Sequence, residues 1–336
     1  DDIDASGVTN GTGAVVVTGL VEAFNNDTIK GSGNGDELIM TADGMTADLT
    51  TGNVNDMTKI TILKGGESDG ATLITDGGVG FNDMLMVDAS ALIDDPLVIG
   101  DAGDFIFDGA GDDTTLISGD GDDSIATAGG KDDITTGKGN DTVSSAGDND
   151  VINTGEGDDS VESGGGADVV FAGAGNDTVT GGSDDDTING EADADMLTGD
   201  GGNDTIDGGL GDDTIEGSNG ADSLTGGLGE DDFVYSTYNQ SRGGNSSIDV
   251  ITDFSEDDDQ FDFSGLNGGG NVFLGNAESF GQAQGLLTGS AGEIVFQQDD
   301  MIVWMDDGDA TLNGNDLQID VSGVMMLDTD NFIGLA

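Results

Sequence analysis

Aspartate residues recur at a fixed spacing through the middle of the chain, and they are the residues that could bind a ligand. Thirteen of them stand nine residues apart: Asp123, Asp132, Asp141, Asp150, Asp159, Asp168, Asp177, Asp186, Asp195, Asp204, Asp213, Asp222 and Asp231. Carboxylate oxygens are the ligands that hard cations such as calcium prefer. The 336 residues include no Cys and no His, so a metal site here must be all-oxygen, and calcium is the first candidate.

An apolar residue follows each of these aspartates by two positions. The thirteen are Ile125, Ile134, Val143, Ile152, Val161, Val170, Val179, Ile188, Leu197, Ile206, Ile215, Leu224 and Phe233. Successive side chains of a β-strand face opposite sides, so the apolar residue points inward and its neighbours point outward. Glycines before each Asp permit a positive φ and a tight turn. Each nine-residue cell therefore predicts one short strand and one turn.

Two cells make one turn of a coil, with a strand on each side, and successive coils stack as parallel strands about 4.8 Å apart. This arrangement places Asp141 beside Asp159 on one edge, and Asp132 beside Asp150 on the other. Opposed carboxylates repel, whereas a calcium ion between them converts the repulsion into coordination that loop carbonyls complete. The pattern predicts roughly a dozen calcium sites.

The chain divides by pattern into three regions. Residues 1–100 predict an irregular β-rich region that continues the coil in degenerate form, 101–233 the regular coil, and 234–336 a cap. Upstream, Asp104 with Ile106 and Asp113 with Leu116 also fit as metal-binding cells. A one-residue slip between Asp113 and Asp123 predicts a bulge or a looser turn. The fold class is all-β, a parallel β-solenoid with a β-rich cap.

The cap has a different composition. Eight of the thirteen Phe residues lie at or after Phe233, and the single Trp, Trp304, is here too, which predicts an aromatic core. Strands are expected at 293–297, 301–305 and 317–321. Tyr235, Tyr238 and Arg242 fit either packing at the cap boundary or a binding spot, and packing is favoured. Trp304 is expected in the core instead of serving as a sugar platform.

The charge excludes several functions. The chain carries 70 acidic and 6 basic residues, a formal charge of -64, so nucleic acid and anionic membrane surfaces are not expected partners. No apolar run reaches the length of a membrane span, so no insertion is expected. Without His, the zinc motif H-E-x-x-H is impossible, and a Ser nucleophile has no imidazole base. Acidic pairs occur everywhere and single out no hydrolytic site. We expect no enzyme activity.

The nonamer resembles the repeats-in-toxin (RTX) family, whose consensus G-G-x-G-x-D-x-U-x is a calcium-binding repeat. The resemblance covers residues 101–233 and implies a parallel β-roll that is disordered without calcium and folds when calcium binds. Some cells depart from the consensus, and in three of them Asp148, Asp184 and Asp193 replace the Gly two positions before the repeat Asp. Those turns are expected to bind calcium differently or more weakly.

The cap resembles the C-terminal domains of serralysin-type proteins. The matching segments are 249–254 (DVITDF), 259–264 (DQFDFS) and the final stretch 324–333 (VMMLDTDNFI), which is similar to an uncleaved export signal. The resemblance implies type I secretion from a Gram-negative bacterium, and an extracellular or cell-surface location.

Three functions fit these features. We expect a secreted calcium-dependent structural protein that folds outside the cell and self-associates into a surface layer, filament or matrix. The chain begins at Asp1 instead of Met, so a secretion and folding cassette of a larger secreted enzyme is an alternative. The other alternative is a calcium-dependent adhesin fragment that binds a carbohydrate such as a cell-surface polysaccharide.

Overall fold

The computed structural model describes residues 115–237 without a break. It also describes residues 113, 240–241, 248–266, 327 and 331–333, and the strands outside these ranges; for β1 to β10 and for β27 the backbone alone is described. Every regular element of the described part longer than one residue is a β-strand, as predicted. Accordingly, none of the described residues form a helix long and apolar enough to cross a membrane.

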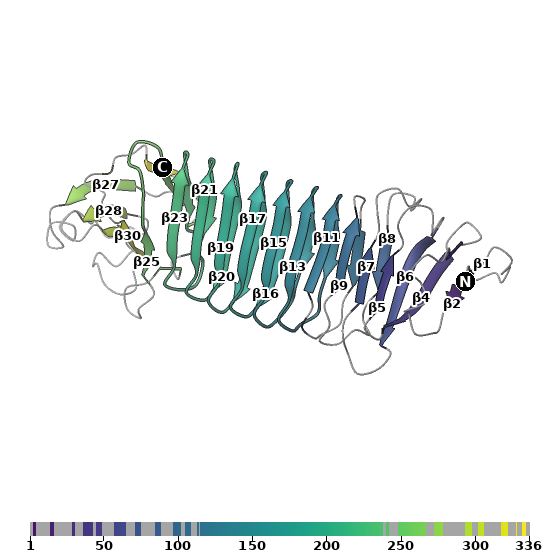
Figure 1. Cartoon of the computed structure of the whole chain (residues 1–336). Helices are drawn as coiled ribbons and strands as arrows, with labels where there is room; N and C mark the ends of the chain where they lie inside the picture. The colour runs from purple at the N-terminus through teal and green to yellow at the C-terminus, as the bar shows by residue number, and fades with distance from the viewer. Residues whose placement is uncertain are drawn as a thin grey trace. The chain divides into compact units, whose positions relative to one another are not determined.

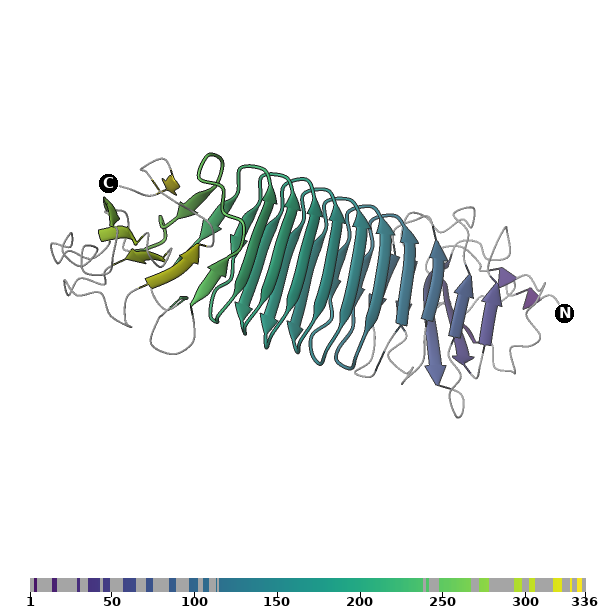
Figure 2. The same ribbon diagram turned by 60° about the vertical axis from the view of Figure 1, so that its left-hand side comes forward.

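The chain is nearly all β, with a parallel β-solenoid of about seven turns over residues 115–233. By contact clustering it comprises two compact units, 1–164 and 165–336, and each is described in turn. From β4 to β26 the chain alternates between two sheets, so that even-numbered strands lie in one sheet and odd-numbered strands in the other (Figure 1). Figure 2 shows the strands of the coil running parallel within each sheet, with the turns along the edges.

In the first unit, β2, β4, β6, β8, β10, β12, β14 and β16 form one sheet, and β5, β7, β9, β11, β13 and β15 form the other; β1 pairs with β3. The bounds are β1 Ile3–Asp4, β2 Ala14–Val16, β3 Ile29–Lys30, β4 Asp36–Ala42, β5 Met45–Asp48, β6 Met57–Lys64, β7 Ala71–Ile74, β8 Leu85–Asp88, β9 Leu97–Asp101, β10 Phe105–Asp108, β11 Thr115–Asp120, β12 Ser124–Ala126, β13 Asp133–Lys138, β14 Thr142–Ser144, β15 Val151–Glu156 and β16 Ser160–Gly165.

The register in the coil is eighteen residues, as two nine-residue cells per turn require. Leu116 pairs with Ile134, and Ile134 pairs with Ile152. Nearer the N-terminus the pairing stays parallel but the spacing lengthens, since Leu38 pairs with Ile60 and Ile60 with Val87. The predicted degenerate β-rich region is confirmed in the backbone, with turns of unequal length between paired strands.

In the second unit, β18, β20, β22, β24, β26 and β31 form one sheet, and β17, β19, β21, β23, β25, β30, β29, β28 and β27 the other. The bounds are β17 Val169–Ala174, β18 Thr178–Ser183, β19 Thr187–Ala192, β20 Met196–Gly201, β21 Thr205–Leu210, β22 Thr214–Glu216, β23 Ser223–Leu228, β24 Asp232–Val234, β25 Asp249–Ile251, β26 Gln260–Asp262, β27 Val272–Ala277, β28 Glu293–Gln297, β29 Ile302–Met305, β30 Leu317–Val321 and β31 Phe332–Ile333. Three of these, β28, β29 and β30, match the cap strands expected from the sequence to within one residue.

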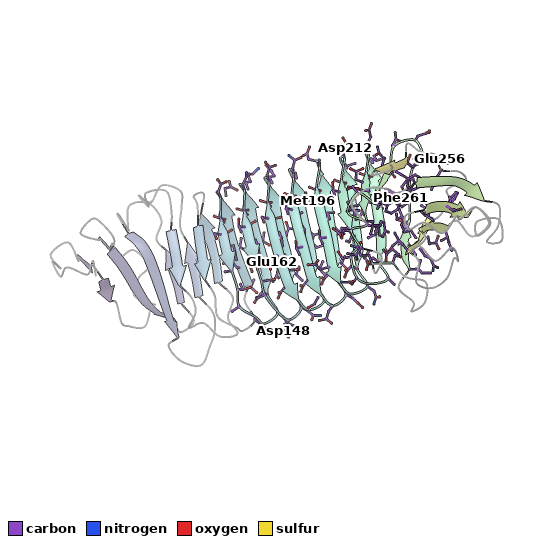
Figure 3. All side chains as sticks on the ribbon, turned by 180° about the vertical axis from the view of Figure 1, so that it is seen from behind. Asp148, Glu162, Met196, Asp212, Glu256 and Phe261 are labelled. Atoms are coloured by element: carbon purple, nitrogen blue, oxygen red, sulfur yellow. The ribbon has the colours of Figure 1, made fainter. Side chains whose placement is uncertain are left out.

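The core of the coil consists of the thirteen repeat apolar residues, which are 0–3% exposed. In the cap the series continues in aromatic residues. Phe233 pairs with Phe261, and Phe261 pairs with Phe332. Phe261, labelled in Figure 3, is part of this core. Its ring stacks on that of Phe254 with ring centroids 4.6 Å apart. Each buried apolar residue anchors the start of a strand, so the Asp two residues earlier is held where the turn meets the strand.

Candidate metal centre

The thirteen repeat aspartates are all buried, with exposed fractions of 1–3%. In each one for which the contact is described, Oδ1 accepts a hydrogen bond from the backbone N–H of the Asp eighteen residues earlier. In the first unit Asp123 N donates to Asp141 Oδ1 at 2.8 Å. In the second, Asp177 N donates to Asp195 Oδ1 at 2.8 Å, and Asp195 N to Asp213 Oδ1 at 2.9 Å. The carboxylates therefore stack in ladders, as the eighteen-residue register predicts.

The second carboxylate oxygen has no such donor at several positions. The Oδ2 atoms of Asp186, Asp195, Asp204 and Asp213 are buried and accept no hydrogen bond. A buried polar atom without a partner costs about 1–3 kcal/mol, and more when it is charged. These oxygens therefore call for a positively charged or proton-donating group in the site.

Glycines lie directly against these oxygens, where a side chain would collide with them. A Cβ atom built on Gly190 would lie 2.3 Å from Asp195 Oδ2 and 2.7 Å from the carbonyl oxygen of Gly208. Gly199 repeats the arrangement, with Asp204 Oδ2 at 2.3 Å and the Gly217 carbonyl oxygen at 2.8 Å. A carboxylate oxygen and a backbone carbonyl oxygen thus approach the same glycine. Calcium is bound in proteins by these two kinds of oxygen, so the residues present fit this ion.

The pKa values of these carboxyls favour a positive charge beside them. Burial raises the pKa of Asp195 and of Asp204 to about 7, and that of Asp186 to about 6. The backbone N–H of Asp177 lowers the pKa of Asp195, while the charges of Asp177 and Asp213 raise it further. Burial without a counter-charge disfavours the ionised form, and a bound cation would reverse that preference.

No three acidic side chains of the described residues are grouped as a metal cluster. Beside Gly190 and Gly199 the structure brings one carboxylate oxygen and one backbone carbonyl oxygen together. The ligand set predicted from the sequence stays a prediction.

The turns before each Asp need left-handed backbone. Gly139 has φ 116°, and a Cβ atom there would lie 2.2 Å from the backbone oxygen of Gly121. Asp148, Asp184 and Asp193 take the same conformation with φ of 73°, 76° and 77°. Asp148 projects from such a turn in Figure 3. The replacements keep the turn, and their different calcium binding stays a prediction.

Asp113 departs from the other predicted metal ligands. Its side chain is exposed, and its Oδ1 accepts the backbone N–H of Lys131 at 2.7 Å. Asp122 has the same role for Asn140 N at 2.8 Å, and it precedes a repeat Asp by one residue. Asp113 therefore belongs to this exposed row, one position before the buried series. Asp104 lies outside the described residues.

A register shift lies between Asp113 and Asp123, where a bulge is predicted: the pairing of β11 with β9 shifts between Ile117 and Gly119. Leu116 pairs with Ile134, so the apolar positions keep their nine-residue spacing through Ile125. The extra residue is in β9. In the upstream cell it is Asp113, and not Leu116, that departs from the nine-residue spacing.

Two further aspartates join the ladders in the cap. Asp222 N donates to Asp249 Oδ1 at 3.1 Å, and Asp231 N donates to Asp259 Oδ1 at 3.2 Å. Asp249 is 0% and Asp259 4% exposed. Sequence reasoning missed both as site residues because they follow their partners by 27 and 28 residues instead of 18. The signal was present, since Ile251 and Phe261 stand two positions after them.

Asp249 lies in the most buried acidic environment. Burial, and then the charge of Asp222, raise its pKa to about 9. Tyr235 is nearby and itself buried, packed on Phe263 with ring centroids 5.9 Å apart. Its place is in the core, as the packing interpretation predicts. Tyr238, Arg242 and the side chain of Trp304 lie outside the described residues.

Comparison with known families agrees with this geometry. Residues 109–143, 144–179, 162–197, 173–206, 180–215 and 198–233 each match the model of the RTX calcium-binding nonapeptide repeat. No curated protein matches the chain. Residues 109–233 are therefore RTX repeats, which form a structural calcium-binding β-roll instead of a catalytic fold and are typical of secreted Gram-negative proteins.

Substituting Asp195 by Asn should separate a ligand role from a packing role. The amide keeps the shape and the Oδ1 acceptor but removes the buried charge, so the metal-free coil should become more stable. Calcium affinity of the sites shared with Asp177 and Asp213 should fall about tenfold or more, because even outer-shell partners of metals are worth ~10–100-fold. Calcium titration calorimetry and denaturant unfolding in chelator measure the two effects.

The exposed Asp212 provides the matched control (Figure 3). The Asp212→Asn substitution removes the same charge from a neighbouring position and should change neither quantity by more than about twofold, as expected of a screened surface charge. Equal calcium affinity in the Asp195→Asn protein and the parent would contradict the assignment.

Proposed function

We propose that the chain is a secreted structural protein that folds on binding calcium outside the cell and then self-assembles into a surface layer, filament or matrix. The observation that carries the proposal is the pair of buried carboxylate ladders, whose charge needs cations at neutral pH. Extracellular calcium modules bind with dissociation constants of about 0.1–1 mM, so such sites fill outside the cell and stay empty in the cytosol.

Export fits the same physics. Without a cation the chain carries its full formal charge of -64, which opposes compaction and keeps the chain threadable. Metal binding is then coupled to folding, because the unfolded chain has no formed site. The segments 249–254, 259–264 and 324–333 support type I secretion, since they resemble the corresponding parts of serralysin-type C-terminal domains.

Self-assembly is supported by open sheet edges. Among the described strands of the first unit, β2 pairs only with β4, and β5 only with β7. A strand paired on one side presents unpaired N–H and C=O groups, which are a template for a strand of another copy. Repeat coils expose such edges unless they are capped.

Electron microscopy of the purified full chain tests the proposal. Ordered sheets or filaments in calcium should disperse when chelator is added. A double variant, Val15→Pro with Thr46→Pro, removes backbone donors from the two edge strands and should abolish assembly while calcium still folds residues 115–233. The matched control is Val15→Thr with Thr46→Val, which keeps both donors and should assemble like the parent. Dispersed monomers of the parent in calcium would overturn self-assembly and favour a secretion cassette or an adhesin.

A further inference from the structure

The residue five positions before each buried Asp differs between the two units. In the first unit it carries a hydroxyl: Ser118, Thr127, Thr136, Ser145 and Thr154 precede Asp123, Asp132, Asp141, Asp150 and Asp159. In the second unit it is Gly181, Gly190, Gly199, Gly208, Gly217 and Gly226 before Asp186, Asp195, Asp204, Asp213, Asp222 and Asp231, with Ala172 before Asp177 and the hydroxyl residue Ser163 before Asp168. This position lines the metal site, so the two units present different site walls.

In the first unit the hydroxyls are buried and already hydrogen bonded. Thr136 Oγ1 donates to the backbone oxygen of Thr154 at 2.8 Å, and Ser145 Oγ donates to that of Ser163 at 2.9 Å. Both side chains are 0% exposed. The carbonyl that a cation would use therefore has a protein donor. The Thr136 hydroxyl also lies by Asp141, where it lowers the pKa against the effect of burial.

In the second unit no donor occupies the corresponding place. Asp195 Oδ2 and the carbonyl oxygen of Gly208 both approach Gly190, and Asp204 Oδ2 and the carbonyl oxygen of Gly217 both approach Gly199. These two Oδ2 atoms are buried and accept no hydrogen bond, as is also true of Asp141 Oδ2 in the first unit, so the two units differ in the carbonyl oxygen and not in Oδ2. The wall of the site thus consists of acceptors alone, and only a cation or an added proton donor satisfies them.

We propose that the coil contains two classes of calcium site, a tighter glycine-lined class at Asp186, Asp195, Asp204 and Asp213 and a weaker hydroxyl-lined class at Asp123, Asp132, Asp141 and Asp150. The hydroxyl competes with calcium for the carbonyl oxygen, whereas the glycine leaves it to the ion. The glycine-lined sites fill first as calcium rises, and the coil orders first around them. This inference rests on calcium binding as proposed above.

Hydrogen exchange of the full chain, followed by mass spectrometry across a calcium chloride titration, tests it. Backbone amides of residues 181–230 should become protected at free calcium about fivefold lower than those of 115–160, the equivalent of one net hydrogen bond per site. Equal midpoints, or protection of 115–160 first, would overturn the two classes while leaving calcium-driven folding intact. Absence of protection in both segments at millimolar calcium would instead refute the proposed function and this inference together.

Removing the hydroxyl from one site tests whether the hydroxyl causes the weaker calcium binding. Thr136→Gly removes the hydroxyl from a weaker site, and Thr135→Gly is the matched control, since it has the same backbone cost but replaces an outward, partly exposed side chain. The midpoint of residues 133–160 should be lower in Thr136→Gly than in Thr135→Gly. An equal or higher midpoint would assign the difference to something other than the hydroxyl.

The reverse change gives an independent measurement. A Cβ atom at Gly199 would lie 2.3 Å from Asp204 Oδ2 and 2.8 Å from the Gly217 carbonyl oxygen, so Gly199→Ser is compared with Gly199→Ala, which has the same Cβ but no hydroxyl. The midpoint of residues 196–215 should be about fivefold higher in Gly199→Ser than in Gly199→Ala. Equal midpoints in the two variants would contradict the proposal. If Gly199→Ser prevents folding altogether, the comparison of Thr136→Gly with Thr135→Gly decides alone.

Discussion

Withdrawal of calcium at neutral pH should unfold residues 115–233. Burial raises the pKa of Asp141, Asp186 and Asp213 to about 6 and that of Asp195 and Asp204 to about 7. Moving one carboxyl pKa from 3.8 to about 6 costs the ionised, metal-free fold about 3 kcal/mol. These carboxyls interact within the ladders, so their costs do not add independently, but all of them oppose folding of the ionised, metal-free chain.

Far-UV circular dichroism and hydrogen exchange measure this loss. In excess chelator the β signal and the amide protection of residues 115–233 should disappear, and millimolar calcium should restore both. Sodium chloride at matched ionic strength is the control for simple charge screening, and it should restore little, because the buried carboxylates are screened less than exposed ones. Cooperative folding in chelator with no divalent ion present would refute the role of calcium.

Acidification should partly replace calcium. The buried aspartates have folded-state pKa values above the unfolded value of 3.8, so the metal-free fold binds more protons than the unfolded chain between these values. Its stability therefore falls as pH rises through about 6–7 and is fully present only below about 3.8. Lowering the pH from about 8 to about 5 in chelator should restore β structure, because protons neutralise the same carboxylates that calcium would bind.

The calcium-bound chain should respond in the opposite direction. Protons compete with calcium for the carboxylate oxygens, so the apparent calcium affinity should weaken as the pH falls from about 7 to about 5. Circular dichroism in chelator and calcium titration calorimetry at each pH give the two trends from one preparation. A metal-free chain that stays unfolded down to about pH 5 would show that carboxylate charge is not what prevents folding.

Much of the fold could be predicted because the repeat is local and regular. A fixed spacing of nine, with an apolar residue two after each Asp, leaves one arrangement in which every apolar residue is buried and strands stack in register. Ile134, Ile152 and their equivalents are buried for this reason. The cap strands at 293–297 and 317–321 were predictable from their β-prone composition, but their order in the sheet, with β29 antiparallel between β28 and β30, was not.

The site was predictable only where the spacing held. Asp113 matches the repeat in sequence to within one residue, and this one-residue difference puts it on the exposed row. Asp249 and Asp259 break the spacing, yet their carboxylates accept the backbone N–H groups of Asp222 and Asp231. A turn of any length can bring the chain back to pair with the preceding strand. Once turn lengths vary, the spacing in the sequence no longer predicts which Asp pairs with which.

The sequence by itself determined the two-sheet coil, the eighteen-residue register and the choice of an all-oxygen cation, because a strict period and a composition without His or Cys permit little else. Only the tertiary structure decided which aspartates are buried, that Asp249 and Asp259 extend the ladders, and that the Thr136 hydroxyl bonds a carbonyl oxygen where Gly199 offers no donor. These features depend on which backbone groups of neighbouring turns are in contact. Hydrogen bonds between the strands determine those contacts, and the sequence spacing alone does not.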